Sequence, residues 1–508
     1  MSRRDGGRAA HRLVEDRTAG ARVVGDRALV LGASIAGTLA ARVLADFYRE
    51  VIVIDRDHVI DVEDPRRGAP HAAHAHGLHA RGCLILQEFF PNLLKDMRRA
   101  HQPIGDLGEQ RWYFNGRPFT PTRTGLLSLT APRPVLEGYL RGQVAARANV
   151  TYRQGTALQG LLATADGARV TGARLQSTTP GAACFDLEAD LLVDASGRGS
   201  RTPVWLQQLG YQRPVEQRMP IGLAYTTRLY RSPHARSGPQ FVNCLASPAS
   251  PRGAFFGQAG DDRHILSLTG LLGDHPPTDP DGFTAFAQGL PAAEIHDRIH
   301  DATPLTDPVT FRFPASVRRH YERLSRLPER LLVLGDAVCS LNPNYSQGMT
   351  VAAMQASALH QYLQRRGTPD SAVFMRQVGR ILDKPWYLST TSDLKFTGAT
   401  GRRQLTAPVL NAYVTRLHHA ATHDPAATDA LMRVASLIDH PATLLRPRLV
   451  LTALSAPAAR LHHDHASAVK AAPAPDQQQP APSPPLPPPT TGDATDDRPV
   501  RKQDTRAH

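Results

Sequence analysis

Two short apolar runs flank a glycine-bearing turn near the start of the chain. Residues 28–31 and 51–54 are uninterrupted apolar runs with the length of buried strands. Between them, "GASIAG" leads into an Ala/Leu-rich segment whose helical periodicity extends through Phe47. Strand, turn, helix and strand in this order predict a βαβ unit.

Further apolar runs follow far downstream, in "ADLLVDASG" (189–197) and in residues 331–334. Between about 205 and 330 the chain alternates in short patterns, "LAYTTRLY", "GAFFGQ" and "HILSLTG", and holds one helical pattern near "DPDGFTAFAQGL". Helical patterns dominate from about 350 to roughly 460. These patterns predict an α/β chain with α+β elements: Rossmann-like pieces that enclose an inserted antiparallel sheet, followed by C-terminal helices.

Composition narrows the class of protein. The net charge of +13 over 508 residues comes mostly from arginines scattered along the chain, without the basic patch that nucleic-acid binding requires. The four cysteines form no CxxC pair, so neither a disulfide framework nor a zinc site is indicated. No apolar run reaches transmembrane length, and the charged N-terminus lacks the apolar core of a secretory signal. We expect a cytoplasmic protein.

The turn "GASIAG" has the spacing of a dinucleotide-binding loop. Gly32 and Gly37 occupy the first and third glycine positions, while Ser34 stands in the middle one. The backbone N–H groups that follow Gly32 open a helix, whose positive end favours a pyrophosphate. Asp55 ends the second strand, where a carboxylate can accept ribose hydroxyls. The predicted nucleotide contacts are Gly32, Ala33, Ser34, Ile35, Ala36, Gly37, Asp55 and Arg56.

Four later segments make the chain recognisable. "LLVLGDAVCSLNPNYSQGMTVAAMQA" resembles the second flavin-binding motif of FAD-dependent monooxygenases of the para-hydroxybenzoate hydroxylase type, and "ADLLVDASGRGSRTPVWLQQLGY" resembles their intermediate Asp-Gly motif. "RRGAPHAAHAHGLHARG" and "APRPVLEGYLRGQV" are similar to two further blocks. The similarity is greatest to bacterial polyketide-tailoring epoxidases that act on polyether precursors. It spans roughly residues 28–460.

The resemblance implies a glutathione-reductase-type FAD domain and assigns residues to it. Asp336 would hydrogen-bond the ribityl chain beside Gly335, Pro343 and Asn344 would line the flavin edge, and the helix opened by Gly348 and Met349 would face the flavin N1 and C2 carbonyl. His76, Arg133 and Asp194 are carried over as further cofactor contacts. The implied division is a disordered extension (1–26), a first FAD-binding segment with small inserted substrate-domain strands (27–204), a substrate domain (205–325), a second FAD-binding segment (326–370), a helical region (371–465) and a disordered Pro-rich tail (466–508).

The chain departs from that subgroup at three positions. Ser346 stands where a glycine is usual, and His71 and Ala73 replace a Gln-x-Arg whose arginine normally helps to hold the cofactor. We therefore expect FAD to be held differently here, or more weakly. The alternate histidines His74, His76 and His79 fit a loop packed along the cofactor better than a metal site. Cys339, inside the flavin motif, is expected to be a small core residue rather than a covalent attachment point.

The resemblance implies a monooxygenase that inserts one oxygen atom of O₂, through a flavin C4a-hydroperoxide, into a large lipophilic substrate such as a polyketide or terpenoid. Epoxidation of an alkene needs no side-chain base, and no catalytic side chain is assigned. A pocket is expected on the inserted sheet, and packing in the core is the favoured alternative for any one of its candidates: Tyr225, Phe255, Phe256, Leu266 and Leu268. NAD(P)H is the expected reductant, with a separate flavin reductase as the alternative.

Several alternatives stay open at the level of sequence. An aromatic hydroxylase and a flavin-dependent alkene reductase fit the same motifs, whereas a halogenase is disfavoured because its Trp-x-Trp-x-Ile-Pro signature is absent. A flavin-binding scaffold without turnover is the non-enzymatic alternative. Peripheral membrane contact through residues 441–463 is less favoured than packing of that segment on the core.

Overall fold

The computed structural model describes residues 23–62, 65–66, 68–231, 239–260, 262–401 and 407–455, all within the unit Met1–Arg460. The predicted tail (466–508) and most of the predicted extension (1–26) lie outside these residues. The first strand begins at Gly25, two residues before the expected start of the folded region. The other domain limits stay predictions.

A five-stranded parallel sheet forms the first layer, because its apolar strands are buried on both faces. The predicted βαβ unit is confirmed as β1, α2 and β2, with β1 in the middle of the sheet. In the order β18-β11-β1-β2-β7, the strands are Leu331–Val333, Leu191–Asp194, Gly25–Leu31, Tyr48–Ile54 and Val150–Arg153.

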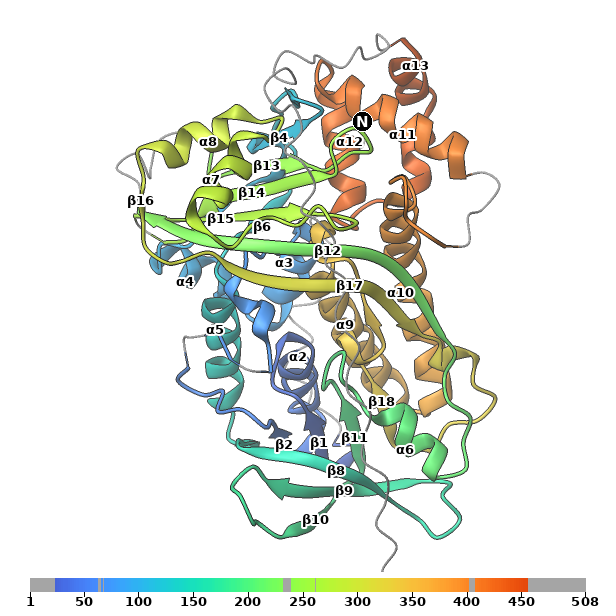
Figure 1. The fold of residues 1–508 in the computed structure, drawn as a ribbon. Helices are drawn as coiled ribbons and strands as arrows, with labels where there is room; N and C mark the ends of the chain where they lie inside the picture. The colour runs from blue at the N-terminus through green and yellow to red at the C-terminus, as the bar shows by residue number, and fades with distance from the viewer. Residues whose placement is uncertain are drawn as a thin grey trace, which may run out of the picture. The chain divides into compact units, whose positions relative to one another are not determined.

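The predicted helix through Phe47 is too long by three residues. Helix α2 (Ile35–Leu44) ends where the Phe47 N–H donates to the carbonyl of Leu44 at 2.9 Å, and this turn delivers Tyr48 to β2. In Figure 1, α2 lies with α5 (Arg133–Ala145) and α9 (Gly348–Arg366) on one side of the sheet. The three-stranded sheet β8–β10 lies on the other side, with the strands Thr156–Ala163, Val170–Ser177 and Cys184–Glu188.

The inserted antiparallel sheet is confirmed, and it has nine strands. Long β12 (Glu216–Arg231) pairs with β15 (Arg263–Gly270) on one side and with β17 (Val309–Arg319) on the other. Unexpectedly, β4 (Arg111–Phe114) joins the sheet in parallel with β13. The remaining strands are β5 (Arg117–Pro118), β13 (Phe241–Leu245), β14 (Arg252–Gln258), β16 (Thr303–Pro304) and β19 (Cys339–Ser340).

The two faces of this sheet have different neighbours. Helices α7 (Pro280–Gln288) and α8 (Ala293–His300) cover one face, as Figure 1 shows. Phe256, Leu266 and Leu268 pack there with the apolar side chains of α7 and α8. Tyr225 belongs instead to the core that includes the nucleotide-binding layer, and Phe255 packs against the cluster formed with the C-terminal helices. Of the five pocket candidates, only Tyr225 and Phe255 therefore lie away from α7 and α8.

Helices complete the described chain, as expected after residue 350. Those beyond α9 are α10 (Ser371–Asp393), α11 (Ala407–Ala421), α12 (Pro425–Ala435) and α13 (Pro447–Ser455). Earlier in the chain are α3 (Ala80–Phe89), α4 (Leu93–Arg99), α6 (Thr202–Gln208) and a small ribbon of β3 (Ile104–Asp106) and β6 (Leu127–Leu129). None of the described helices has the length and apolarity to cross a bilayer.

Candidate functional site

Three of the predicted motifs meet at the carboxyl ends of neighbouring strands. They are the nucleotide loop, the Asp-Gly motif and the second flavin-binding motif. β1, β11 and β18 are adjacent, and each leads directly into one motif. A Cβ on Gly32 would lie 2.6 Å from the carbonyl oxygen of Ala195, and a Cβ on Gly335 would lie 2.5 Å from the Cβ of Ala36. The nucleotide loop is therefore in close contact with both of the other motifs. The three motifs therefore converge at the edge where open α/β sheets bind ligands.

The glycines of the nucleotide loop are required by this geometry. Gly32 has φ of +95°, in the region that glycine adopts most easily. A Cβ on Gly37 would stand 1.7 Å from the carbonyl oxygen of Gly32, so only glycine lets α2 approach the turn. Ser34, the N-cap residue of α2, makes no side-chain cap bond, which leaves backbone N–H groups of the first turn available to an anion. This cradle fits a pyrophosphate.

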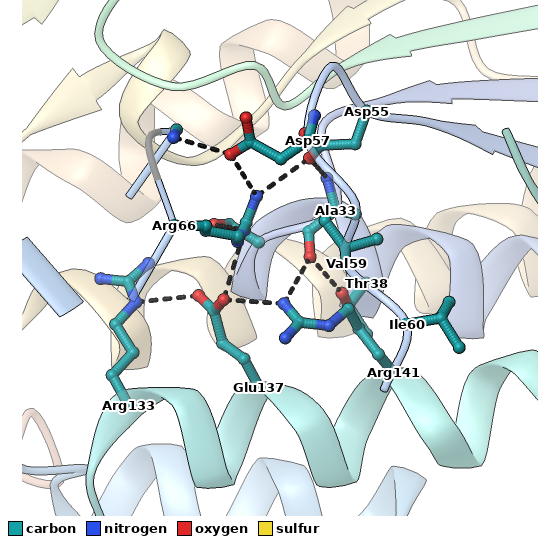
Figure 2. A network of polar contacts seen from close by, with 12 residues as sticks. Ala33, Thr38, Asp55, Asp57, Val59, Ile60, Arg66, Arg133, Glu137 and Arg141 are labelled. Atoms are coloured by element: carbon teal, nitrogen blue, oxygen red, sulfur yellow. Dashed lines mark hydrogen bonds and ion pairs between the residues drawn. The ribbon is translucent and has the colours of Figure 1, made fainter. Parts of the chain in front are cut away.

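A buried network of charges supports the loop (Figure 2). Asp55 accepts the backbone N–H of Ala33 at 2.7 Å, and Arg66 donates to Asp55 at 3.2 Å and to Ser34 Oγ at 2.6 Å. Arg66 also pairs with Glu137 at 3.3 Å, on helix α5. Asp55 therefore anchors the loop through protein contacts, and its bond to a ribose stays a prediction.

Glu137 is the centre of this network. It is 3% exposed and contacts three arginines: Arg66, Arg133 at 2.8 Å and Arg141 at 2.9 Å. Burial alone would raise the pKa of Glu137, but the arginines outweigh it and lower the pKa to about 2. Arg141 also donates to the carbonyl of Ala33 at 3.3 Å. The cluster thus fixes the nucleotide loop from the side of α5.

Sequence reasoning named Arg133 as a cofactor contact, which stays a prediction, and missed its neighbours in the network. Arg133, Glu137 and Arg141 follow one another at i, i+4 spacing on α5, and this spacing was the available signal. Arg66 opens one of the segments quoted above, but no local pattern could have indicated its pairing with Glu137, which is 71 residues away in the chain. The residue that replaces the usual glutamine, His71, contacts Arg133 through Nε2 at 2.5 Å.

The flavin motif offers a carboxylate with capacity to bind hydroxyls. Gly335 has φ of +62°, which turns the chain so that Asp336 faces a cluster of cations. Loss of solvent raises the pKa of Asp336, against the opposing effect of Arg133, Arg198 and Arg319. Among the described residues, the hydrogen bond seen at its carboxylate comes from Ser340 Oγ, at 3.4 Å. Asp336 therefore has the free acceptor capacity that a ribityl chain requires.

The segment from Pro343 to Gly348 forms a tight turn before α9. Pro343–Tyr345 is a 3₁₀ turn in which Asn342 accepts the N–H of Asn344 at 3.0 Å. Ser346, which replaces a glycine of the subgroup, is left-handed at φ +50°. The predicted start of the helix at Gly348 is confirmed. The turn thus keeps the conformation of a glycine with a serine in its place.

A buried residue that sequence reasoning missed holds this turn through hydrogen bonds. Asp393, at the end of α10, is fully buried and accepts from Asn342 Nδ2 and from the Tyr345 hydroxyl, both at 2.8 Å. Burial raises the pKa of Asp393 to about 6. On the opposite side, His79 Nε2 contacts the Tyr345 carbonyl at 2.9 Å. The flavin turn is therefore held by α10 and by the histidine segment together.

The histidines of residues 71–79 make separate contacts. His74 Nδ1 bonds Thr227 at 2.7 Å, and His76 Nδ1 bonds the carbonyl of His74 at 2.9 Å. Burial lowers the pKa of His74 to about 4 and that of His76 to about 3, so both are neutral at pH 7. In the described regions of the chain, no three His, Cys, Asp or Glu side chains are arranged to hold a metal ion.

The remaining predicted residues differ in their surroundings. Arg56 is exposed. Asp194 is fully buried and bonds Ser196, Ser200 and Thr202, so its effect on a cofactor would pass through the loop that these contacts shape. Cys339 is buried in the core, where loss of solvent raises the pKa of its thiol. Contacts with the cofactor stay predictions for these residues and for all the other predicted positions.

Comparisons with known proteins agree with this geometry. The FAD binding domain family matches residues 27–368. Protein Rv3254 of Mycobacterium tuberculosis is 33% identical over 428 residues, which cover 82% of this chain and 90% of that protein. Among solved structures, a flavoprotein/dehydrogenase from Cytophaga hutchinsonii is similar at a TM-score of 0.59 and 14% identity, covering 85% of this chain and 98% of the other.

A second solved structure is pqsL of Pseudomonas aeruginosa, described as a probable FAD-dependent monooxygenase. Its TM-score is 0.52 at 18% identity, covering 73% of this chain and 96% of the other. At such low identity these structural likenesses show the fold. The family match, which spans all three convergent motifs, shows more, and with it the cofactor: this chain belongs to the FAD binding domain family.

Proposed function

We propose that this protein is an FAD-dependent monooxygenase that inserts one oxygen atom of O₂ into a large lipophilic substrate, most simply by epoxidation of an alkene. The observation that carries the proposal is the meeting of three motifs beside the sheet face that bears Tyr225. Bound FAD would supply the activation of O₂. The reductant would be NAD(P)H.

The chain's own residues would bind and orient the cofactor. The first turn of α2 would receive the pyrophosphate, with the loop held by Asp55 and by the arginines around Glu137. Asp336 would accept ribityl hydroxyls. The N-terminus of α9, a helix of 19 residues beginning at Gly348, would place its positive end against the developing negative charge of the reduced ring.

The surroundings favour chemistry that excludes water and uses no charged base. His74 and His76 are neutral at pH 7, and the pKa of Tyr225 is raised well above its ordinary value by burial. An oxygen-transfer site must be dry, because water diverts the reactive oxygen species. Neutral, aromatic and buried groups on the sheet side suit an uncharged, lipophilic substrate.

The test begins with the visible spectrum of the purified protein. A flavin spectrum, NADH or NADPH oxidation under air and a product heavier by one oxygen atom are expected with a polyene substrate. Incorporation of ¹⁸O from ¹⁸O₂ into the product would identify oxygen insertion. A product that has gained two hydrogen atoms would instead show an alkene reductase and contradict the proposal. Parallel reactions with a polyene and a phenol separate epoxidation from aromatic hydroxylation. If reduction occurs only when a flavin reductase is added, the reductant is delivered by that partner.

A further inference from the structure

Two buried polar groups on the sheet side of the site lack partners among the described residues. They are Nε2 of His74 and the hydroxyl of Tyr225. The side chains are 3% and 8% exposed, so water does not freely reach them. A buried polar group without a partner costs about 1–3 kcal/mol, which makes two of them on contacting rings worth explaining.

The two groups belong to one aromatic cluster. The rings of His74 and Tyr225 stack with their centroids 5.5 Å apart and an interplanar angle of 29°. Phe311, which lies opposite Tyr225 in the β12–β17 ladder, contacts both rings at 5.9 and 6.3 Å. The cluster therefore combines an apolar ring surface with two polar atoms.

The chain of hydrogen bonds behind His74 determines which of its nitrogens carries the proton. The N–H of Ala75 donates to Ser267 Oγ at 3.0 Å, Ser267 and Thr227 are 2.6 Å apart, and Thr227 is 2.7 Å from His74 Nδ1. Both hydroxyls find an acceptor within this series of hydrogen bonds only if Ser267 donates to Thr227 and Thr227 donates to His74 Nδ1. In the opposite direction the Ser267 hydroxyl would have no acceptor in the series. In the neutral ring the proton is then on Nε2, which becomes a donor without an acceptor.

Tyr225 supplies a second donor close to the flavin motif. Its neighbour Arg198 is committed elsewhere, donating to Ser340 Oγ at 3.2 Å and to the carbonyl of Ala315 at 3.1 Å. The cluster thus offers hydrogen-bond donors without offering a free positive charge. A buried carboxylate would be poorly compensated there, whereas a neutral oxygen acceptor with two lone pairs would be satisfied.

We propose that His74 and Tyr225 form a subsite for a neutral carbonyl oxygen of the substrate, so that the substrate is a lipophilic ketone, ester or amide rather than a hydrocarbon or an acid. This inference rests on the proposed function and adds the substrate class to it. The subsite would fix the orientation of the substrate by one polar end, as expected of a mostly apolar pocket with few polar groups. His74 and Tyr225 are then specificity-determining residues, and Ser267 and Thr227 act through His74 as positioning residues.

The experiment compares two probes on the FAD-loaded full chain. Geranylacetone is a lipophilic ketone with two alkenes, and its partner is the hydrocarbon in which CH₂ replaces the carbonyl. Calorimetry measures the binding of each, and the flavin spectrum is followed in parallel. We expect the ketone to bind at least about tenfold more tightly, and the preference to fall by roughly tenfold in Tyr225→Phe and in His74→Phe.

A matched control is available on the same strand. Tyr230 is also a buried tyrosine of β12, but it packs in the cluster under α7 and α8. Tyr230→Phe should leave the ketone preference unchanged. Equal affinities for the two probes, or no detectable binding of the ketone, would overturn the proposal. So would a loss of FAD affinity in the two variants without a loss of ketone preference, because the donors would then serve the cofactor.

Failure of this proposal differs from failure of the proposed function. A protein that binds FAD and oxidises NAD(P)H but shows no ketone preference refutes the subsite alone. A protein that takes up no FAD refutes the monooxygenase assignment, while calorimetry still reports whether the ketone binds.

Discussion

Removing the charge of Glu137 should destabilise the protein by an amount that the structure allows us to estimate. The perturbation is Glu137→Gln, which keeps the size and shape of the side chain. Its carboxylate is buried and faces Arg66, Arg133 and Arg141. On folding, the pKa of Glu137 falls from 4.5 to about 2. At about 1.4 kcal/mol for each unit of pKa, this difference of roughly 2.5 contributes on the order of 3 kcal/mol to the free energy of unfolding at neutral pH.

An independent argument gives a similar magnitude. Removing one partner of a buried ion pair costs about 3–5 kcal/mol, because the remaining charge is left buried without compensation. The free energy of unfolding, from urea denaturation of the FAD-free protein at pH 7, should therefore fall by about 3 kcal/mol. Because folding lowers the pKa of Glu137, its contribution is complete above about pH 4.5 and is lost as the pH falls toward 2. The difference between the two proteins should narrow in that range.

A control of the same chemical type is Glu50→Gln. Glu50 pairs with Arg27 at 2.6 Å, but the two side chains are 41% and 38% exposed. Solvent screens such a pair, so a loss below about 1 kcal/mol is expected. If Glu137→Gln costs no more than Glu50→Gln, or if its effect does not depend on pH below 4.5, the reasoning about the arginine cluster is wrong.

Three further predictions concern single positions. Ser346→Gly should raise the free energy of unfolding by about 0.5–1 kcal/mol, because Ser346 is left-handed, whereas Ser346→Ala, which keeps a Cβ, should bring no gain in the same denaturation assay. Gly335→Ala should lower the free energy of unfolding by more than about 2 kcal/mol, because the new Cβ would collide with Ala36, and it should weaken FAD binding in a flavin titration. The control is Gly142→Ala on α5, where a Cβ meets no neighbouring atom, and it should have neither effect. Burial lowers the pKa of His418 to about 3, so as the pH falls the unfolded chain binds the proton first, and the free energy of unfolding decreases between about pH 6.5 and 3. His418→Leu should therefore reduce the slope of the unfolding free energy against pH in this range by up to about 1.4 kcal/mol per pH unit. An unchanged slope would contradict this expectation.

Local patterns in the sequence predicted the elements better than the contacts between them. The βαβ unit, the inserted sheet and the start of α9 at Gly348 follow from apolar periodicity and turn residues, which act over a few positions. The four residues of β4 are too short for such a signal, and their partner β13 comes more than a hundred residues later. Their pairing could not be predicted from one sequence.

The candidate site shows the same division. The glycines of both loops were predicted because each is required by its own turn. Asp393 was missed because its chemistry depends on Tyr345, 48 residues away, and on burial that only the packed helices create. Phe256, Leu266 and Leu268 pack in the core under α7 and α8, on a face that could not be predicted, because alternation shows that a strand has two faces without showing which face meets the cofactor.

The short strand β19 has a consequence for motion in this protein. Cys339 and Ser340 belong to the flavin motif, yet they pair with Arg318 and Val317 at the edge of the nine-stranded sheet. The flavin motif is thus paired, main chain to main chain, with the sheet that would hold the substrate, just upstream of the turn that begins at Pro343. Opening like a hinge between those two regions would have to break this ladder. Displacement of β17 would instead move Cys339 and Ser340 with it, so a shift of the sheet would be transmitted to the flavin motif.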